Sequence, residues 1–260
     1  MSLLEQVEQA YYHALGIRKE FPELNPIACG LMVAGSLLHA GKHHSIIKGH
    51  LLPASGAAIL TGNHYQEGDI YEACLAARKA GRLVRTIVKK SLVVEGDYES
   101  EEYLRNIGDK KNPLDYSPMK AFVMKGVGVI PIPRDNPGRG FATHCLRIMD
   151  SGQLLGIFLQ PSRDEEGLLR NLQGGVALFA SAKKYRDVPV YPIAFSDDRA
   201  IVLEPFTYNQ IRDQDYGRDI TVAEFTIYIA DRIAAALPKK VQDDWKTRRD
   251  KEFLRLSTSS

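Results

Sequence analysis

The sequence predicts one α/β domain, in which a mostly parallel mixed sheet is flanked by helices and preceded by an N-terminal helical cap. Short apolar runs alternate with longer amphipathic ones, which is typical of strands and helices that take turns along a chain. The apolar runs are nearly continuous, as in strands buried on both faces of a parallel sheet. No internal repeat and no Pro-, Gly- or Ser-rich linker divides the 260 residues. We therefore expect a helical cap over residues 1–45 and the α/β domain over residues 46–260.

The individual elements follow from the same periodicities. Each expected strand is a short apolar run, such as AAILT at 57–61. Each expected helix repeats apolar residues every three or four positions, such as Ile70, Ala73 and Ala77. The segment 95–113 is polar and has no apolar period, so we expect a surface excursion there. Strands are expected over 57–61, 83–88, 127–132, 154–159 and 188–195, and helices over 69–81, 117–125, 139–151, 174–185, 221–237 and 239–256.

Composition and charge exclude several classes of protein. With 44% hydrophobic and 25% charged residues, the chain has an ordinary globular composition, unlike disordered or low-complexity sequences. Its 34 Lys and Arg residues face 32 Asp and Glu residues, and a net charge of +2 creates no overall field that attracts nucleic acid. Three well-separated cysteines, Cys29, Cys74 and Cys145, fit reduced thiols better than a disulfide framework.

Membrane and export signals are weak. No stretch approaches the roughly 20 apolar residues needed to cross a bilayer. The nearest candidate, 26–40, is interrupted by Gly30 and Gly35. The first residues, MSLLEQVEQ, lack the basic start and cleavage site of a secretory signal and indicate an amphipathic helix. We expect a cytoplasmic protein whose membrane attachment, if it has one, is peripheral and on the cytoplasmic face.

The stretch 57–72, AAILTGNHYQEGDIYE, carries the most informative chemistry. An apolar strand delivers His64 into a loop, and Asp69 begins the next helix. Loops at strand ends hold catalytic groups on a rigid scaffold and leave them open to substrate. A histidine with a carboxylate in reach can act as a general base near neutral pH, because the carboxylate fixes one tautomer and stabilises the imidazolium. Such a pair suits removal of a proton from an alcohol.

A structural interpretation of the same residues is also open. Asp69 followed by Glu72 has the form of a capping box, in which Asp69 does no more than satisfy the first N–H groups of the helix. A lone histidine after a strand is often structural. Spacing alone does not decide between the two interpretations.

Three further segments come in a particular order after this stretch. They are GVIPIPR at 128–134, FLQPSR at 158–163 and VPVYPIAF at 188–195. Together with Asn63-His64-x-x-x-x-Asp69, this order resembles the four-block pattern of the glycerolipid acyltransferases, which include glycerol-3-phosphate and lysophosphatidic acid acyltransferases. The resemblance spans about residues 48–206 and ends in a Leu-Glu-Pro-Phe segment.

The resemblance implies a role for several residues. His64 would be the general base that deprotonates the acceptor hydroxyl, and Asp69 would orient it. The alcohol would attack the acyl thioester directly, so no enzyme nucleophile is needed and the missing G-x-S-x-G motif is expected. Arg134 would bind the acceptor's phosphate, because a guanidinium matches phosphate oxygens in a bidentate way. Its alternative role is a surface ion pair with Asp135.

The third block departs from the family pattern Phe-Pro-Glu-Gly-Thr-Arg. Gln160 and Pro161 stand in place of the glutamate and the glycine, whereas Ser162 and Arg163 fit. Gln160 can still accept a hydrogen bond from a substrate hydroxyl, but it carries no charge. We therefore expect Arg134, Gln160, Ser162 and Arg163 to bind substrate. The departure also leaves open the alternative that this chain is a catalytically inactive relative of the family.

Two basic clusters are candidates for binding. The first lies close behind the His64 stretch and could receive the phosphates of coenzyme A or the acidic face of an acyl carrier protein, with Arg85, Lys89 and Lys90 as the expected donor-binding residues; a solvated surface is the alternative. The second, in 239–255, mixes basic and aromatic residues as an interfacial helix does, but its acidic residues favour a solvated helix. The first cluster comprises Arg78, Lys79, Arg82, Arg85, Lys89 and Lys90.

Four histidines, His39, His43, His44 and His50, raise the alternative of a metal-dependent hydrolase. No carboxylate or cysteine with ligand spacing stands beside them, so we expect no metal. We expect no bound cofactor either, with acyl-CoA or acyl carrier protein as the acyl donor.

The expected function is transfer of a fatty acyl group from that thioester to a hydroxyl of glycerol 3-phosphate or a lysophospholipid, in phospholipid biosynthesis. The alternative from another class is a catalytically inactive lipid-binding or scaffold protein that has an acyltransferase-like fold.

Overall fold

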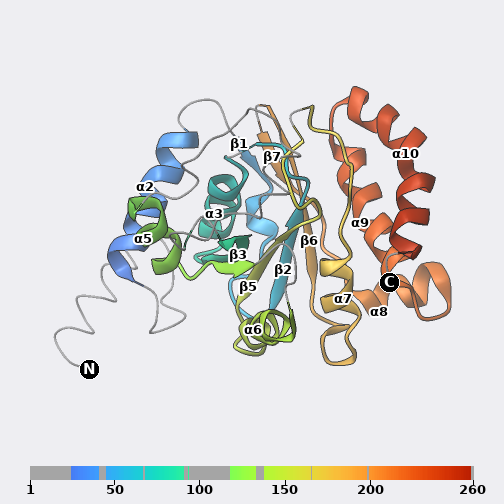
Figure 1. Cartoon of the computed structure of the whole chain (residues 1–260), viewed down its shortest axis with the longest axis horizontal. Coiled ribbons are helices and arrows are strands. Elements are labelled where there is room, and N and C mark those ends of the chain that lie inside the picture. Colours follow the sequence, from blue (N-terminus) through green and yellow to red (C-terminus); the bar gives the residue numbers. More distant parts are fainter. Residues whose placement is uncertain are drawn as a thin grey trace.

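A seven-stranded sheet forms the middle layer of the described part of the protein, with helices on both of its faces (Figure 1). The computed structural model describes residues 25–40, 45–66, 68–90, 93, 118–132, 138–164, 166–197 and 199–258. The strands are β1 (Ser45–Ile47), β2 (Ala58–Gly62), β3 (Val84–Lys89), β4 (Ile130–Ile132), β5 (Leu154–Phe158), β6 (Val190–Ser196) and β7 (Arg199–Val202).

The strand order is β1-β7-β6-β2-β5-β3-β4. Neighbouring strands from β6 through β2, β5 and β3 to β4 run parallel, whereas β6 and β7 form an antiparallel pair and β1 runs parallel to β7. The predicted mostly parallel mixed sheet is thus confirmed. Because five neighbouring strands are parallel, their carboxyl ends meet at one edge, where α/β proteins place their sites.

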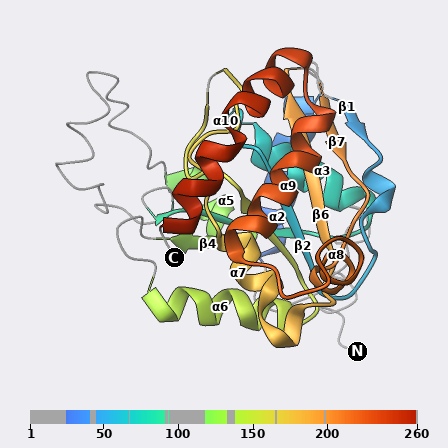
Figure 2. The same cartoon turned by 90° about the vertical axis from the view of Figure 1, so that its right-hand side faces the viewer.

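Helices cover the sheet in two layers (Figures 1 and 2). One layer holds α2 (Pro26–Ala40), α3 (Asp69–Lys79) and α5 (Pro118–Gly126), with α2 packed on the other two. On the opposite face, α7 (Gly175–Ser181) and α9 (Val222–Ala236) pack together, and α10 (Lys239–Thr258) packs on α9. The remaining helical elements are α6 (Gly138–Asp150), α8 (Tyr208–Ile211), the short 3-10 helices Gly49–Leu51 and Lys183–Tyr185, and the π-helical turn Arg212–Tyr216.

Two hydrophobic cores lie on the two faces of the sheet. One joins β2, β3 and β6 to α2 and α3, and the other joins β5 to α6, α7, α9 and α10. Every residue of β2 is buried. A strand covered on both faces needs apolar side chains at successive positions, which explains the continuous apolar runs of the sequence.

The predicted strands and helices are present with small shifts of their ends, with one correction. The helix expected over 174–185 breaks at Ala182, whose extended backbone (φ −61°, ψ 129°) separates α7 from the 3-10 helix Lys183–Tyr185. The segment 95–113 lies outside the described residues, as do residues 1–24 and 41–44, and the cap boundary at residue 45 stays a prediction. No helix in the described ranges combines the length and the apolarity that a bilayer span requires.

Candidate active site

His64 lies just beyond the carboxyl end of β2, the strand between β5 and β6. The sheet register pairs Gly62 with Phe158 of β5 and with Ile193 of β6, so β2 and β5 end level with each other while β6 continues to Ser196 beside the residues that follow β2. A Cβ atom at Gly62 would come within 2.6 Å of the Phe195 ring and 2.7 Å of the Ile193 carbonyl oxygen. Glycine is therefore required for the close approach of β2 to β6 beside the site.

Asn63 fixes the path of the chain as it leaves β2. Its side-chain amide donates to the carbonyl oxygen of Phe195 at 2.9 Å and accepts from the Phe195 N–H at 2.8 Å. The side chain is fully buried, and its two hydrogen bonds to the backbone of Phe195 extend the pairing of β2 with β6 by one residue. The loop that carries His64 therefore starts from a rigid point.

His64 and Asp69 form a hydrogen-bonded pair. The ring Nδ1 of His64 lies 2.9 Å from Oδ2 of Asp69, whose side chain is fully buried. The same oxygen accepts the backbone N–H groups of Tyr65 at 2.7 Å and Gln66 at 3.0 Å. Burial raises the pKa of Asp69, and the hydrogen bonds from His64 and the two N–H groups oppose that rise. With Nδ1 engaged, Nε2 is the ring nitrogen left for proton transfer.

The geometry does not support the capping interpretation of Asp69. Helix α3 begins at Asp69 with Gly68 as its N-cap residue, and no side-chain hydrogen bond caps it among the described residues. The Asp69 carboxylate instead binds the loop that precedes the helix and the imidazole on that loop. This arrangement orients the histidine.

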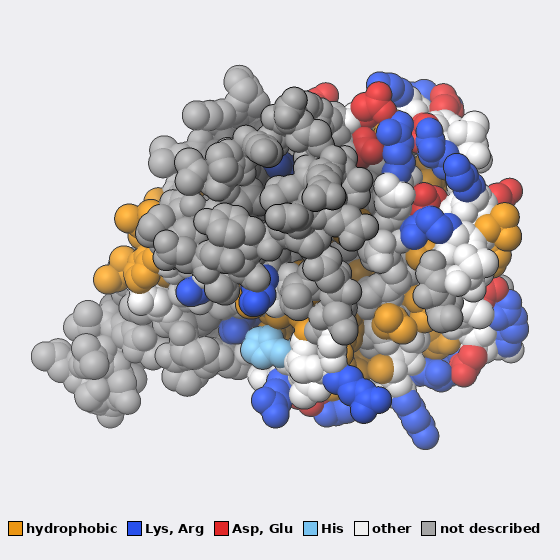
Figure 3. Space-filling model, in the orientation of Figure 1, with side chains coloured by type: hydrophobic (Ala, Val, Ile, Leu, Met, Phe, Trp, Pro, Cys, Tyr) orange, Lys and Arg blue, Asp and Glu red, His pale blue; other side chains and the backbone are white. Residues whose placement is uncertain are grey.

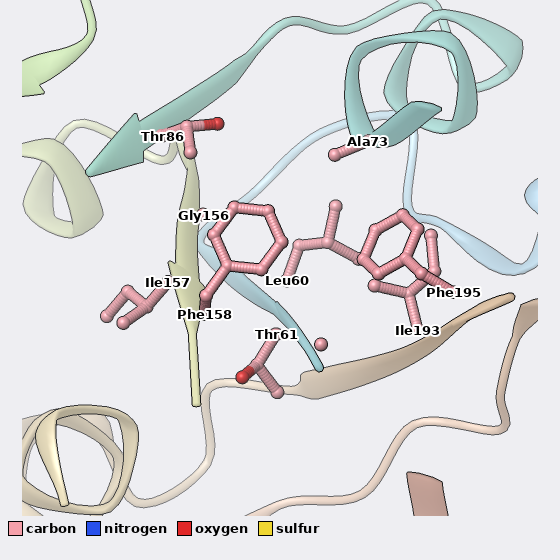
Figure 4. Close-up of a pocket in the computed structure, with 10 residues that line it drawn as sticks. Leu60, Thr61, Ala73, Thr86, Gly156, Ile157, Phe158, Ile193 and Phe195 are labelled. Carbon is pink, nitrogen blue, oxygen red and sulfur yellow. The ribbon is translucent and has the colours of Figure 1, made fainter. Parts of the chain in front are cut away.

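Phe158 supports the imidazole from one face. The two rings are stacked, with centroids 4.5 Å apart and an interplanar angle of 17°. Phe158 also contacts Phe195, and both rings line a small apolar pocket with Leu60, Ala73 and residues of the neighbouring strands (Figure 4). The pocket measures about 10 Å³, room for about one water molecule, so it cannot take an acyl chain unless these rings move.

The segment after β5 holds the backbone of His64. Gln160, only 4% exposed, accepts the His64 N–H at its Oε1 (3.0 Å) and donates from Nε2 to the carbonyl oxygen of Leu168 (2.9 Å). Asp164 donates its N–H to the His64 carbonyl oxygen at 2.9 Å. Substrate binding by Gln160 stays a prediction, and the structure shows both ends of its amide bound to backbone groups.

The other predicted substrate-binding residues are placed only in part. Ser162 and Arg163 are exposed on the segment that follows β5, at the same edge of the sheet as His64. Arg134 lies outside the described residues. Their roles stay predictions.

The first basic cluster is not a continuous surface, which corrects the expectation for Arg85. Arg85 is 6% exposed, and its guanidinium donates to the Gly128 carbonyl oxygen and, at 3.1 Å, to Oε1 of Gln153. Arg82 is fully buried and donates to the carbonyl oxygen of Gly152 at 2.7 Å. Buried guanidinium groups that bind carbonyl oxygens in this way stabilise the fold and are not open to a phosphate. Lys89 and Lys90, half-buried at the carboxyl end of β3, keep their predicted role as an expectation.

Metal ligands do not gather among the residues that the structure describes, where no group of three or more His, Cys, Asp and Glu side chains could hold an ion. His50 is exposed on the 3-10 helix Gly49–Leu51. His43 and His44 lie outside the described residues, as does the side chain of His39.

Glu72 is a second buried carboxyl group, one helical turn after Asp69. It is fully buried, and its Oε1 lies 3.4 Å from the Gln66 side-chain nitrogen. Burial, together with the nearby Asp69 charge, raises the pKa of Glu72 from 4.5 to about 8. A carboxyl group with a pKa of about 8 is mostly protonated at neutral pH.

Glu72→Gln should remove a pH dependence of stability. A carboxyl group whose pKa is higher in the folded state binds more protons when folded, so the free energy of unfolding falls as pH rises from about 4.5 to about 8. Relative to wild type, we expect Glu72→Gln to gain about 2 kcal/mol in free energy of unfolding between pH 5.5 and 7.5, measured with urea.

A matched control for this experiment is Glu224→Gln. Arg218 and Thr221 lower the pKa of Glu224 to about 2, so that group is ionised throughout the same range. The free energy of unfolding of Glu224→Gln should differ from that of wild type by the same amount at every pH in this range. A constant difference for Glu72→Gln as well would show that Glu72 is ionised at neutral pH.

The fold and the site together define a class of protein: an α/β protein with a His–Asp pair at the carboxyl edge of a parallel sheet. Residues 105–196 match the sequence model of the acyltransferase family, a range that includes the second, third and fourth blocks and follows His64 and Asp69. This match confirms the predicted resemblance to the glycerolipid acyltransferases.

A solved structure shows the same fold. The 1-acyl-sn-glycerophosphate (LPA) acyltransferase PlsC from Thermotoga maritima is 11% identical in sequence, and the match covers 90% of this chain and 95% of that chain with a TM-score of 0.50. No curated protein sequence matches the chain.

Proposed function

We propose that this protein transfers a fatty acyl group from acyl-CoA or acyl carrier protein to a hydroxyl of glycerol 3-phosphate or a lysophospholipid, in phospholipid biosynthesis. The observation that carries this proposal is the His64–Asp69 pair, with its 2.9 Å hydrogen bond, at the carboxyl edge of an acyltransferase fold. The buried carboxylate fixes the imidazole so that Nε2 can receive a proton.

The chemistry needs a base and no enzyme nucleophile. Nε2 of His64 takes the proton of the acceptor hydroxyl while the hydroxyl oxygen attacks the carbonyl carbon of the thioester. The tetrahedral oxyanion that forms needs backbone N–H groups or a nearby cation. Its collapse breaks the C–S bond, and the imidazolium returns the proton to the leaving thiolate. An ester and a free thiol result, and Asp69 stabilises the imidazolium between the two steps.

An exposed apolar surface supports binding at a membrane, where a lysolipid acceptor resides. Ile27 and Leu31 of α2 are 62% and 42% exposed, and Met119 and Phe122 of α5 are 64% and 41% exposed. These two helices pack together, and hydrophobic side chains gather at that end of the molecule in Figure 3. Exposed apolar groups of this kind favour contact with a lipid surface. We propose a cytoplasmic protein that can attach to the cytoplasmic face of the membrane as a peripheral protein.

A panel of donors and acceptors tests the function. Palmitoyl-CoA and palmitoyl carrier protein are each offered with glycerol 3-phosphate, lysophosphatidic acid and, as a phosphate-free control, glycerol, and the products are identified by mass spectrometry. We expect acylated product with a phosphorylated acceptor and at least about 100-fold less with glycerol, because each charge-assisted phosphate contact strengthens binding. Lipid binding without product from any pair would instead identify the inactive lipid-binding protein.

A further inference from the structure

Gln160 joins the loop of His64 to the segment that follows β5. We propose that Gln160 is a positioning residue that fixes the backbone of the catalytic base, and that this task requires a side chain that accepts one hydrogen bond and donates another. The proposal rests on the proposed function, since the group that is positioned is His64.

The two bonds of Gln160 run in opposite senses. Its Oε1 accepts the N–H of His64 at 3.0 Å, and its Nε2 donates to the carbonyl oxygen of Leu168 at 2.9 Å. The side chain is 4% exposed, and Leu168 is buried as well. Water cannot readily replace either bond, so loss of one leaves a buried polar group without a partner.

His64 is held at four points, and Gln160 provides the one nearest to the strand. Asp69 binds the ring, Phe158 stacks on its face, and the Asp164 N–H binds the backbone carbonyl oxygen. Gln160 binds the backbone N–H where the chain leaves β2. A displacement of about 1 Å at a reacting group can cost about 100-fold in rate. A change at Gln160 should therefore alter turnover without altering the contacts of the substrates.

The Leu168 carbonyl oxygen, which accepts the hydrogen bond from Gln160, belongs to a segment that is itself held in place. Asp164 Oδ1 accepts the Leu168 N–H at 3.1 Å. A few residues on, the N–H groups of Asn171 and Leu172 donate to the buried carboxylate of Glu252 on α10, at 3.0 and 3.2 Å. The Leu168 carbonyl oxygen therefore cannot easily turn away from a side chain that offers it no hydrogen.

A glutamate, the residue of the family pattern, would fit in shape in this chain, but it would not offer the hydrogen that the Leu168 carbonyl oxygen accepts here. An ionised carboxylate accepts the His64 N–H but turns its second oxygen toward the Leu168 carbonyl oxygen, and two acceptors then face each other in a buried site. A protonated carboxyl group makes both bonds. Gln160→Glu should therefore have activity close to that of wild type only at a pH at which its carboxyl group is protonated.

The test compares Gln160→Glu, Gln160→Met and wild type from pH 5 to 8. Gln160→Met keeps the length of the side chain and can make neither bond at any pH. Gln173→Glu is the matched control, because it adds the same charge to an exposed position on the same segment. Values of kcat and KM are expressed relative to wild type at each pH, so that any titration shared with wild type cancels.

We expect Gln160→Met to lose about 100-fold in kcat at every pH, with KM for donor and acceptor within about twofold of wild type. Gln160→Glu should lie within about threefold of wild type at pH 5 and fall toward the value of Gln160→Met as its carboxyl group ionises. Gln173→Glu should follow wild type throughout. A rise in KM for the acceptor with unchanged kcat would overturn the proposal and show that Gln160 contacts substrate.

A second measurement does not depend on turnover. The amide proton of His64, observed by NMR, should exchange with solvent at least about tenfold faster in Gln160→Met than in wild type, while amides of α9 exchange at unchanged rates. Equal exchange of the His64 amide in both proteins would overturn the proposal. If wild type shows this protection but acylates no acceptor, the proposed function fails and the positioning contact stands.

Discussion

Replacing His64 with alanine is expected to lower kcat for acyl transfer by about 1,000-fold, because it removes the group that takes the acceptor's proton. The imidazole is fixed by Asp69 at 2.9 Å and by the stacked ring of Phe158, and its Nε2 is the nitrogen available to the acceptor. Donor and acceptor binding do not require this proton transfer. The initial rate at saturating substrates should therefore fall while lipid binding stays close to that of wild type.

The control for this variant is His50→Ala. His50 is an exposed histidine on the 3-10 helix Gly49–Leu51, which precedes β2, and its removal should change the rate by less than about twofold. If His64→Ala kept more than about a tenth of the wild-type rate, proton transfer by this histidine could not be the source of catalysis.

Asp69→Asn should lower kcat by about 100-fold to 1,000-fold, through loss of charge more than loss of shape. Oδ2 of Asp69 accepts all three hydrogen bonds, from His64, Tyr65 and Gln66. Oδ1 is buried and has no hydrogen-bond partner among the described residues. An asparagine can therefore keep its oxygen in the Oδ2 position and the amide in the place of Oδ1. What it lacks is the negative charge that stabilises the imidazolium.

Asp69→Ala separates charge from structure. It also removes the acceptor for the two loop N–H groups, so we expect a lower melting temperature and a rate below that of Asp69→Asn. A wild-type rate for Asp69→Asn would show that the carboxylate only holds the loop.

The central part of the fold and the nearness of His64 to Asp69 could be predicted from the sequence, because strand and helix periodicity locate both residues. The buried run of β2 ends directly before His64, and Asp69 starts the next amphipathic helix. Strands β1 and β7, the last two at one end of the sheet, were not predicted, because runs of three and four residues, exposed at part of their positions, give little periodicity.

Residues that act through distant backbone groups could not be predicted. The partners of Gln160 are a backbone N–H and a carbonyl oxygen, and neither has a signature in the sequence. Arg82 and Arg85 belong to a basic run, and because such runs are usually solvated, their burial could not be predicted. The carbonyl groups that make their burial possible come from residues more than 40 positions away, at Gly152 and Gly128.

The decisive measurement is the stoichiometry of one reaction, in which the thiol released from palmitoyl-CoA and the lipid products are both counted by mass spectrometry. If His64 activates the acceptor hydroxyl for direct attack on the thioester, one acylated acceptor forms for each thiol released, and His64→Ala lowers both together. Thiol release matched by free fatty acid, with no acylated acceptor, would mean that water and not the acceptor hydroxyl is the attacking group. An unchanged yield of acylated acceptor from His64→Ala would contradict the role of the His64–Asp69 pair.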